Sequence, residues 1–351
     1  MYKICFVLPG VTRQPVGGYK MVYEFANRLV NEGCEVFILY TNELLYKKYN
    51  IPKCIKAFLA NCETKIQPKW FDLDSRVKKF STLDPNYVNR LADLDVCIAT
   101  AVETVDIVYY KIQAKKKIYY IQDYEVWSID KDYVHKTYGL GMKNIVISTW
   151  LQEIVDKYSK FPSILIPNPI DTSIYTSKIP MLKRKQHTIG LLYHTGVHKG
   201  LKNAFKVLNK VKEIYPDLEV KMFGQFPRPN VPNWIEYTRG ASQKKTVEIY
   251  NWCQVFLCST IKEGYGLTGI EAMACGACLV STDYDGAKEY AIDGYNALLS
   301  PVGDIQAQVD NIVRLFEDPD LRNELSKNGI TSAKEHSWSE AMDKFNKVIS
   351  G

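Results

Sequence analysis

The sequence contains no uninterrupted run of 18 or more apolar residues among its 351 positions. A helix that crosses a bilayer is therefore not expected. The first ten residues, MYKICFVLPG, place only five apolar residues between Lys3 and Pro9. Because that stretch is too short for the apolar core of a signal peptide, we expect it to form a first strand and the protein to be cytoplasmic.

Signatures of metal, redox and dinucleotide chemistry are also missing. The nine cysteines are odd in number and mostly lie in apolar, strand-like runs, so we expect reduced, buried thiols. Cys275 and Cys278 form a C-x-x-C, but no second Cys or His pair accompanies it, so no metal site is expected. No G-x-G-x-x-G follows the first strand, because VLPGVTRQPVGG has the wrong spacing, which argues against a dehydrogenase.

The net charge of +6 is unevenly distributed. Residues 1–170 hold 23 Lys and Arg against 18 Asp and Glu, whereas the remainder hold 22 against 21. A basic N-terminal half is compatible with peripheral contact with an anionic membrane surface, with an anionic acceptor, or with ordinary solvated faces. Nucleic acid is not expected, because neither a recognition-helix motif nor an aromatic–basic RNA signature is present.

The first half alternates apolar, strand-like runs with helical patterns. We expect strands at 2–8, 35–40, 95–100, 117–122 and 144–148, and helices at 17–33 and 149–158. Ser148 or Thr149 can cap the second of these helices, since Gln152 follows Thr149 at the spacing of a capping box. Residues 41–93 are less regular. Such β-α alternation predicts a parallel sheet with helices on both faces.

A proline-rich turn, IPNPID at 166–171, interrupts this pattern before it restarts. We expect strands at 188–193, 218–224, 255–259 and 277–282, helices at 202–214, 243–251 and 303–317, and a final helix capped by Ser337. The expected division is an N-terminal Rossmann-like domain (1–168), a C-terminal Rossmann-like domain (169–336) and a helix returning to the first domain (337–351). The predicted fold class is α/β, with two doubly wound domains facing each other across a cleft.

The stretch EGYGLTGIEAMACG, residues 263–276, is the most informative part of the chain. It joins a buried strand to a helix expected near Thr268 through a loop with glycines at 264, 266 and 269. Unpaired N–H groups and the helix dipole make such a turn an anion site, and glycines allow close approach and positive φ. Glu263 and Glu271 suit a ligand that also carries hydroxyl groups, as a sugar nucleotide does.

This pattern resembles the E-x7-E signature of the family 4 retaining glycosyltransferases, which have the GT-B fold. The resemblance implies that Glu271 binds the ribose hydroxyls of the donor, and that Glu263 faces the donor sugar or steadies the developing oxocarbenium charge. It also implies that backbone N–H groups of the intervening loop receive the β-phosphate. The residues of that loop are Gly264, Tyr265, Gly266, Leu267 and Thr268.

Two further segments resemble donor-binding motifs of the same family. Gly17-Gly18, before a helix, is similar to its glycine loop. YHTGVHKG, residues 193–200, falls where the family has G-R-x4-K-G, so Lys199 matches the diphosphate lysine and His194 stands in the place of the arginine. Either His194 is charged beside the diphosphate, or another cation supplies the missing contact.

A second departure follows the strand at 117–122, where the family often has His-Asp and this chain has Gln122-Asp123. Gln122 can hydrogen-bond a hydroxyl but cannot take up a proton, so the leaving diphosphate would accept the proton of the acceptor. The surrounding aromatic stretch YYIQDYEVW either stacks on a sugar ring or packs the domain edge. This Gln-Asp variant resembles bacterial rhamnosyltransferase-like members, which implies a deoxysugar donor.

The sequence therefore predicts a metal-independent retaining hexosyltransferase. Glu263, Asp123 and Gln122 are the candidate catalytic residues, and no cofactor is expected beyond a nucleoside-diphosphate sugar as donor substrate. The expected acceptor is a glycan or a lipid-linked molecule of bacterial cell-surface polysaccharide synthesis. Two alternatives remain, namely a sugar-nucleotide 2-epimerase of the same architecture and a non-catalytic sugar-nucleotide-binding subunit.

Overall fold

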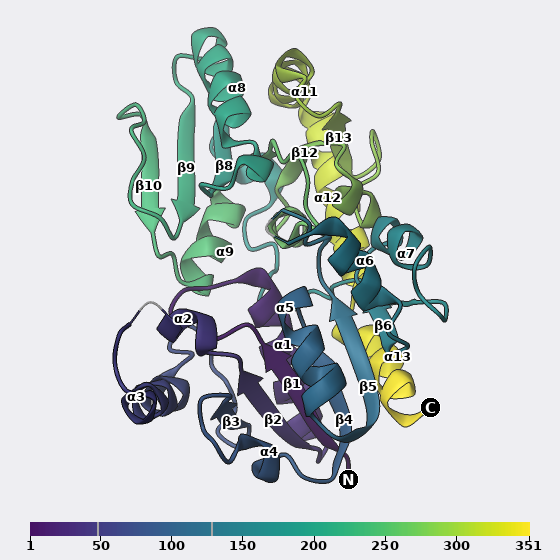
Figure 1. Cartoon of the computed structure of the whole chain (residues 1–351). Coiled ribbons are helices and arrows are strands. Elements are labelled where there is room, and N and C mark those ends of the chain that lie inside the picture. The colour runs from purple at the N-terminus through teal and green to yellow at the C-terminus, as the bar shows by residue number, and fades with distance from the viewer. Residues whose placement is uncertain (48, 128) are drawn as a thin grey trace. The chain divides into compact units, whose positions relative to one another are not determined.

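The computed structural model of the chain describes residues 1–47, 49–127 and 129–351. Two compact units divide it (Figure 1). Unit 1 comprises residues 1–166 together with 342–351, and unit 2 comprises residues 167–341. In the described parts of the chain, no helix is both long and apolar enough to cross a membrane.

A parallel sheet forms the centre of unit 1. Within the described residues its order is β3-β2-β1-β4-β5-β6-β7. The strands are β1 (Lys3–Leu8), β2 (Glu35–Tyr40), β3 (Lys78–Ser81), β4 (Leu94–Ala99), β5 (Ala114–Ile121), β6 (Lys143–Val146) and β7 (Ile164–Leu165). Because β1 pairs with both β2 and β4, the order reverses between β1 and β4, which is the topological switch point of this unit.

Helices connect these strands. They are α1 (Gly17–Asn31), α2 (Glu43–Lys47), α3 (Lys53–Ile66), α4 (Tyr87–Arg90), α5 (Val102–Asp106), the π-helix η1 (Ile107–Lys111), α6 (Lys131–Tyr138) and α7 (Thr149–Val155). The buried face of α1 includes Phe25, at the helical spacing that the sequence predicts. Phe345, on α13 (Trp338–Ser350), stacks on Phe25 with ring centroids 4.5 Å apart and is fully buried. Residues 342–351 thus complete the core of unit 1.

Unit 2 repeats the architecture. Its sheet has the order β10-β9-β8-β11-β12-β13 within the described chain, and all of its strand pairs are parallel. The strands are β8 (Thr188–Tyr193), β9 (Glu219–Gly224), β10 (Ile235–Arg239), β11 (Val255–Cys258), β12 (Cys278–Thr282) and β13 (Ala297–Ser300). The order reverses between β8 and β11, so the switch point of this unit lies between these two strands.

The helical elements of unit 2 are η2 (Met181–Lys183), η3 (Val197–Lys199), α8 (Leu201–Ile214), α9 (Gln243–Trp252), α10 (Leu267–Ala274), η4 (Asp285–Glu289), α11 (Ile305–Glu317) and α12 (Pro319–Glu335). Two doubly wound parallel sheets confirm the predicted α/β class. The oxygen of the Ser337 side chain accepts from the backbone N–H of Glu340 at 3.2 Å, which confirms the predicted cap of α13.

The predicted capping box at α7 is wrong. The N-cap is Ser148, one of the two predicted residues, but its side chain makes no capping hydrogen bond. The Gln152 amide instead donates to the carbonyl of Ser163 at 2.9 Å and so ties α7 to the segment before β7. A tertiary partner therefore replaces the local one that the spacing suggested.

Arg184 ties together the carboxyl ends of two helices in unit 2. Its side chain is 5% exposed, and its guanidinium donates to the carbonyls of Ile179 (3.1 Å), Tyr250 (2.8 Å), Cys253 (2.6 Å) and Cys275 (2.5 Å). Tyr250 and Cys253 lie at the end of α9, and Cys275 follows α10. A cation here also complements the negative ends of both helix dipoles.

We expect Arg184→Met to lower the free energy of unfolding by about 2–4 kcal/mol, because several buried carbonyls lose their donor. Lys185→Met is the matched control, since its exposed ion pair with Glu219 contributes less than about 1 kcal/mol. Urea denaturation measures both variants. Equal losses in the two would contradict the role assigned to Arg184.

Candidate active site

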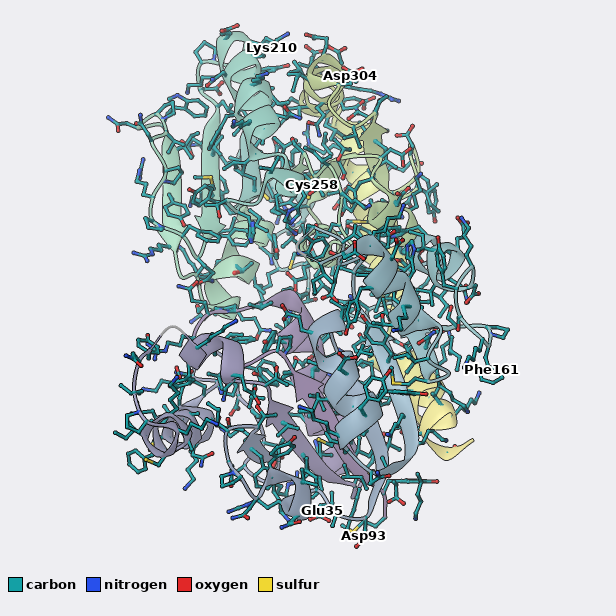
Figure 2. The ribbon with its side chains drawn as sticks, in the orientation of Figure 1. Glu35, Asp93, Phe161, Lys210, Cys258 and Asp304 are labelled. Atoms are coloured by element: carbon teal, nitrogen blue, oxygen red, sulfur yellow. The ribbon has the colours of Figure 1, made fainter. Side chains whose placement is uncertain are left out.

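The candidate site of unit 2 lies at its switch point, where parallel α/β sheets bind ligands. Here β8 leads through residues 194–200 into α8, and β11 leads through residues 259–266 into α10. Cys258, which is labelled in Figure 2, is the last residue of β11 and shows where the second loop begins. The two loops contain all the donor-binding residues predicted for this unit except Leu267, Thr268 and Glu271, which lie on α10.

Glycine at position 200 brings these two loops together. Gly200 has φ +64°, and a Cβ on it would lie 1.7 Å from the carbonyl oxygen of Ser259. The carbonyl of His198 also accepts from the backbone N–H groups of Ile261 (2.7 Å) and Lys262 (3.2 Å). No side chain fits at position 200, because the backbones touch there.

This close approach places Lys199 beside Glu263, and the Lys199 ammonium donates to the Glu263 carboxylate. Both side chains are largely buried, with 17% and 23% of their surfaces exposed. Two residues that the sequence predicted from separate motifs therefore form one ion pair. The pair joins the loop before α8 to the loop that opens α10.

Two tyrosines support the start of α10. Gly266, its N-cap, has φ +92°, as a positive-φ glycine was predicted to have. Its carbonyl accepts from the Tyr290 hydroxyl at 2.8 Å, and a Cβ on it would lie 1.9 Å from the Tyr284 hydroxyl oxygen. A Cβ on Gly269 would lie 2.4 Å from the Tyr290 hydroxyl oxygen. These glycines are required by packing against the tyrosines as well as by any ligand at the loop.

The remaining loop residues are fixed in the same way. A Cβ on Gly286 would lie 2.5 Å from the carbonyl oxygen of Glu263 and 2.8 Å from the carbonyl carbon of Gly264. The Tyr265 side chain is buried and its hydroxyl is 3.0 Å from Nδ1 of His336. Leu267 and Thr268 lie in the first turn of α10.

Glu271 points into the protein, with 6% of its surface exposed. The Tyr250 hydroxyl donates to its carboxylate at 3.0 Å. Burial, followed by the charge of Glu271, raises the pKa of Tyr250 well above its usual value, so the phenol keeps the proton that it donates. Tyr250 thereby orients the carboxylate that the resemblance assigns to the ribose.

His194 follows β8 and is half-buried. Its Nδ1 accepts from the backbone N–H of Gly196 at 2.9 Å, which assigns the proton of the neutral ring to Nε2. Burial first, and then the nearby charges of Lys199 and His198, lower the pKa of His194. Of the two alternatives above, these surroundings disfavour a charged His194 and favour a second cation for the diphosphate.

Unit 1 assembles the other predicted residues at the carboxyl ends of its strands. Gly18 lies in the first turn of α1, where a Cβ would be 3.1 Å from Oε1 of Gln122; Gly17 precedes it. The Gln122 amide donates to the carbonyl of Thr100 at 3.4 Å, whereas its Oε1 is buried without a partner among the described residues. Asp123 Oδ1 accepts from the N–H of Tyr124 at 2.8 Å.

The aromatic stretch around Gln122 divides by exposure. Tyr119, Tyr120 and Tyr124 are buried, at 1%, 1% and 8%, and therefore pack the domain. Trp127 is 64% exposed. Among the described residues, no group of three or more His, Cys, Asp or Glu could hold a metal ion.

Residues 180–332 match the family model described as glycosyl transferases group 1. That range includes His194, Lys199 and the whole loop from Glu263 to Gly276. The match covers somewhat less than half of the chain, and over this part the chain is similar to the group 1 glycosyl transferases. The predicted family resemblance is thereby confirmed, whereas the rhamnosyltransferase-like assignment and the interpretation of Glu263 and Glu271 as an E-x7-E pair stay predictions.

Curated glycosyltransferases are similar to this chain over part of their length. An uncharacterized glycosyltransferase of Methanocaldococcus jannaschii is 25% identical over 215 residues, which are 59% of this chain and 58% of that protein. The N,N'-diacetylbacillosaminyl-diphospho-undecaprenol alpha-1,3-N-acetylgalactosaminyltransferase of Campylobacter jejuni is 26% identical over 144 residues, which are 40% of this chain and 38% of that protein. The chain thus matches less than two thirds of the length of each.

Solved structures are similar over the whole chain. HepE of Anabaena in complex with UDP-glucose superposes with a TM-score of 0.77 at 14% identity, covering 100% of both chains. Sucrose-phosphate synthase from Thermosynechococcus elongatus gives 0.77 at 15% identity, covering 99% of this chain and 98% of that one. These likenesses confirm the predicted GT-B fold of two Rossmann-like domains.

Glu125 is a candidate residue that the sequence motifs did not reveal. Its carboxylate accepts from the backbone N–H of Val102 at 2.6 Å. Burial raises the pKa of Glu125 to about 7, opposed by that hydrogen bond and assisted by the charges of Asp123 and Glu103. A carboxyl group that titrates near neutral pH, two residues from Asp123, is suited to proton transfer. Its position in an aromatic stretch gave no signal of this environment.

Gly266→Ala is expected to lower the melting temperature by at least about 5 °C, because the methyl group would overlap the Tyr284 hydroxyl and the backbone would be strained. Gly294→Ala is the matched control, since Gly294 also has positive φ (+71°) but a Cβ on it would meet no atom within 4 Å. The melting temperature of Gly294→Ala should fall by clearly less than that of Gly266→Ala. Calorimetry compares them, and equal losses would mean that strain alone matters at position 266.

The raised pKa of Glu125 predicts a dependence of stability on pH. Between about pH 4.5 and 7 the folded protein retains a proton that the unfolded chain has released, so the wild type loses unfolding free energy as the pH rises through this window. Glu125→Gln keeps the acceptor for Val102 and removes this loss. From pH 4.5 to 8 the variant should gain up to about 3 kcal/mol relative to the wild type.

Glu153→Gln is the control for that experiment, because Glu153 is an exposed carboxylate on α7 of the same unit and its charge is not one of those that raise the pKa of Glu125. Its curve of unfolding free energy against pH should follow that of the wild type. If the Glu125→Gln curve also follows the wild type, Glu125 titrates at its ordinary value.

Proposed function

We propose that this protein is a metal-independent retaining glycosyltransferase that uses a nucleoside-diphosphate sugar. The observation that carries the proposal is the Lys199–Glu263 ion pair at the start of α10, at the switch point of unit 2. Nearby, on the same helix, Glu271 presents a second, buried carboxylate. A cation, a helix N-terminus and two carboxylates match the phosphates and hydroxyl groups of such a donor.

Each group receives a distinct task in this proposal. The N–H groups that open α10 and the ammonium of Lys199 bind the diphosphate, and neutralise the charge that develops on it as it leaves. Glu271, oriented by Tyr250, accepts hydrogen bonds from the ribose hydroxyls. Glu263, released from Lys199 by the phosphate, faces the donor sugar. Gly17, Gly18 and His194 line the donor as further contacts.

The reaction replaces one bond at the anomeric carbon by another on the same face. The bond from that carbon to the β-phosphate oxygen breaks, the acceptor oxygen forms the new bond, and the proton of the acceptor passes to the leaving diphosphate. Gln122 hydrogen-bonds a hydroxyl without taking the proton, since an amide is not basic. Asp123 and Glu125 are the titratable groups of unit 1 beside it.

The acceptor that we propose is a glycan or a lipid-linked molecule of bacterial cell-surface polysaccharide synthesis, bound by unit 1. Support comes from the names of relatives. The Campylobacter enzyme carries a diphospho-undecaprenol acceptor in its name. A capsular polysaccharide biosynthesis glycosyltransferase of Staphylococcus aureus is 31% identical over 83 residues. A deoxysugar donor stays a prediction, and it rests on the Gln122-Asp123 pair, which resembles that of rhamnosyltransferase-like members.

The test begins with a thermal-shift screen against UDP-, GDP-, dTDP- and ADP-sugars, followed by donor hydrolysis and transfer. Lys199→Gln and Glu271→Gln should each lower turnover about a hundredfold, because each removes a contact to the leaving group or the nucleotide. Lys202→Gln is the control, since Lys202 is an exposed lysine in the first turn of α8. It should retain wild-type turnover.

Full turnover in both site variants would refute the proposal. Product analysis separates the alternatives: conversion of donor without any acceptor indicates an epimerase, and donor binding without turnover across an acceptor panel indicates a non-catalytic subunit.

A further inference from the structure

The helix α3 of unit 1 exposes its large apolar residues and buries its small ones. Ile55, Phe58, Leu59 and Ile66 are 45%, 67%, 42% and 55% exposed, and we call these four the α3 face. Ala60 and Thr64 are its buried residues. At about 100° per residue the α3 face forms one stripe about 100° wide. A helix that serves only the core of its own unit would have the opposite arrangement.

The inner side of α3 is firmly held. The Asn42 amide donates to the Thr64 hydroxyl oxygen at 3.2 Å, and Glu63 accepts from Arg13 (2.8 Å) and from the Tyr46 hydroxyl (2.9 Å). α3 also packs beside β3, the edge strand of the sheet (Figure 1). The exposure of the α3 face is therefore a property of a fixed helix.

Positive charge borders the stripe on both sides. By the same helical spacing, Lys65 lies at one margin and Lys56 at the other. Residues 49–69 contain four lysines, Lys69 included, and one acid, and that acid, Glu63, is paired with Arg13. Apolar side chains between lysine margins are the pattern of a helix that lies in the surface of an anionic bilayer.

We propose that the α3 face binds the surface of an anionic lipid bilayer. A second copy of the chain fits less well, because a self-complementary contact would bring the lysine margins of both copies together. The proposal rests on the proposed function in one respect: a bilayer bound by unit 1 would bring a lipid-linked acceptor to the unit that is proposed to bind it. Asn42, which holds α3, also accepts from the N–H of Val11, in the loop that leads to Gly17.

The experiment is co-sedimentation of the full chain with vesicles of phosphatidylcholine alone or mixed equally with phosphatidylglycerol. The wild type should bind the mixed vesicles at least tenfold more tightly, and less so at high salt. Phe58→Ser/Ile66→Ser and, separately, Lys56→Glu/Lys65→Glu should each reduce binding at least tenfold.

Phe161→Ser is the matched control. Phe161 is 61% exposed, close to the 67% of Phe58, and lies in the same unit on the loop after α7 (Figure 2). This variant should bind mixed vesicles within twofold of the wild type. All variants should keep the wild-type melting temperature and the wild-type thermal shift with donor, because none touches the α10 site.

Three results would overturn the proposal. They are wild-type binding that does not respond to phosphatidylglycerol, unchanged binding by both double variants, and a wild-type dimer that Phe58→Ser/Ile66→Ser converts to monomer in light scattering. Donor binding is read in unit 2 and vesicle binding in unit 1. Loss of one with retention of the other therefore shows which of the two proposals has failed.

Discussion

The contact between the backbone at Gly200 and the carbonyl of Ser259 is the constraint on which the arrangement of unit 2 depends. It joins the loops after β8 and β11, so that a lysine from one motif meets a glutamate from another 64 residues later. Neither loop alone holds both members of this ion pair. The strands bring the loops to the same edge of the sheet, and a residue without a side chain lets them touch.

Much of this could be predicted from local pattern. The buried strands and amphipathic helices of both units lie where the periodicity placed them, because burial on a parallel sheet leaves an apolar run that is easily recognised. The helix α12 was missed, although Asp318 and Pro319 form an ordinary N-terminal signal, with the Asp318 side chain accepting from the N–H of Leu321. Its weakly amphipathic sequence gave no clear period. The strands β3, β7, β10 and β13 were missed as well; β7 has only two residues, and β3 and β10 carry charged side chains in place of an apolar run.

The residues that support the site could not be predicted from local pattern, because they are distant in the sequence or depend on burial in the folded unit. Tyr250 acts on Glu271 from 21 positions away, and Tyr290 acts on Gly266 from 24 positions away. Nothing in the local sequence distinguishes these tyrosines from core tyrosines. Glu125 is similar, because its raised pKa comes from burial that only the folded unit creates. The sequence predicted which groups would touch a ligand, whereas the groups that hold them depend on tertiary contacts.

The stacking of Phe345 on Phe25 has a consequence for how the chain is made. The sheet of unit 1 is encoded almost entirely in the first half of the chain, yet part of its core comes from residues 342–351. During synthesis, part of the apolar core of unit 1 stays uncovered while unit 2 is translated. The ribosome must pass residue 345 before unit 1 can complete its core. Most of unit 1 is therefore synthesised before unit 2, but its core is completed only after unit 2 has been translated.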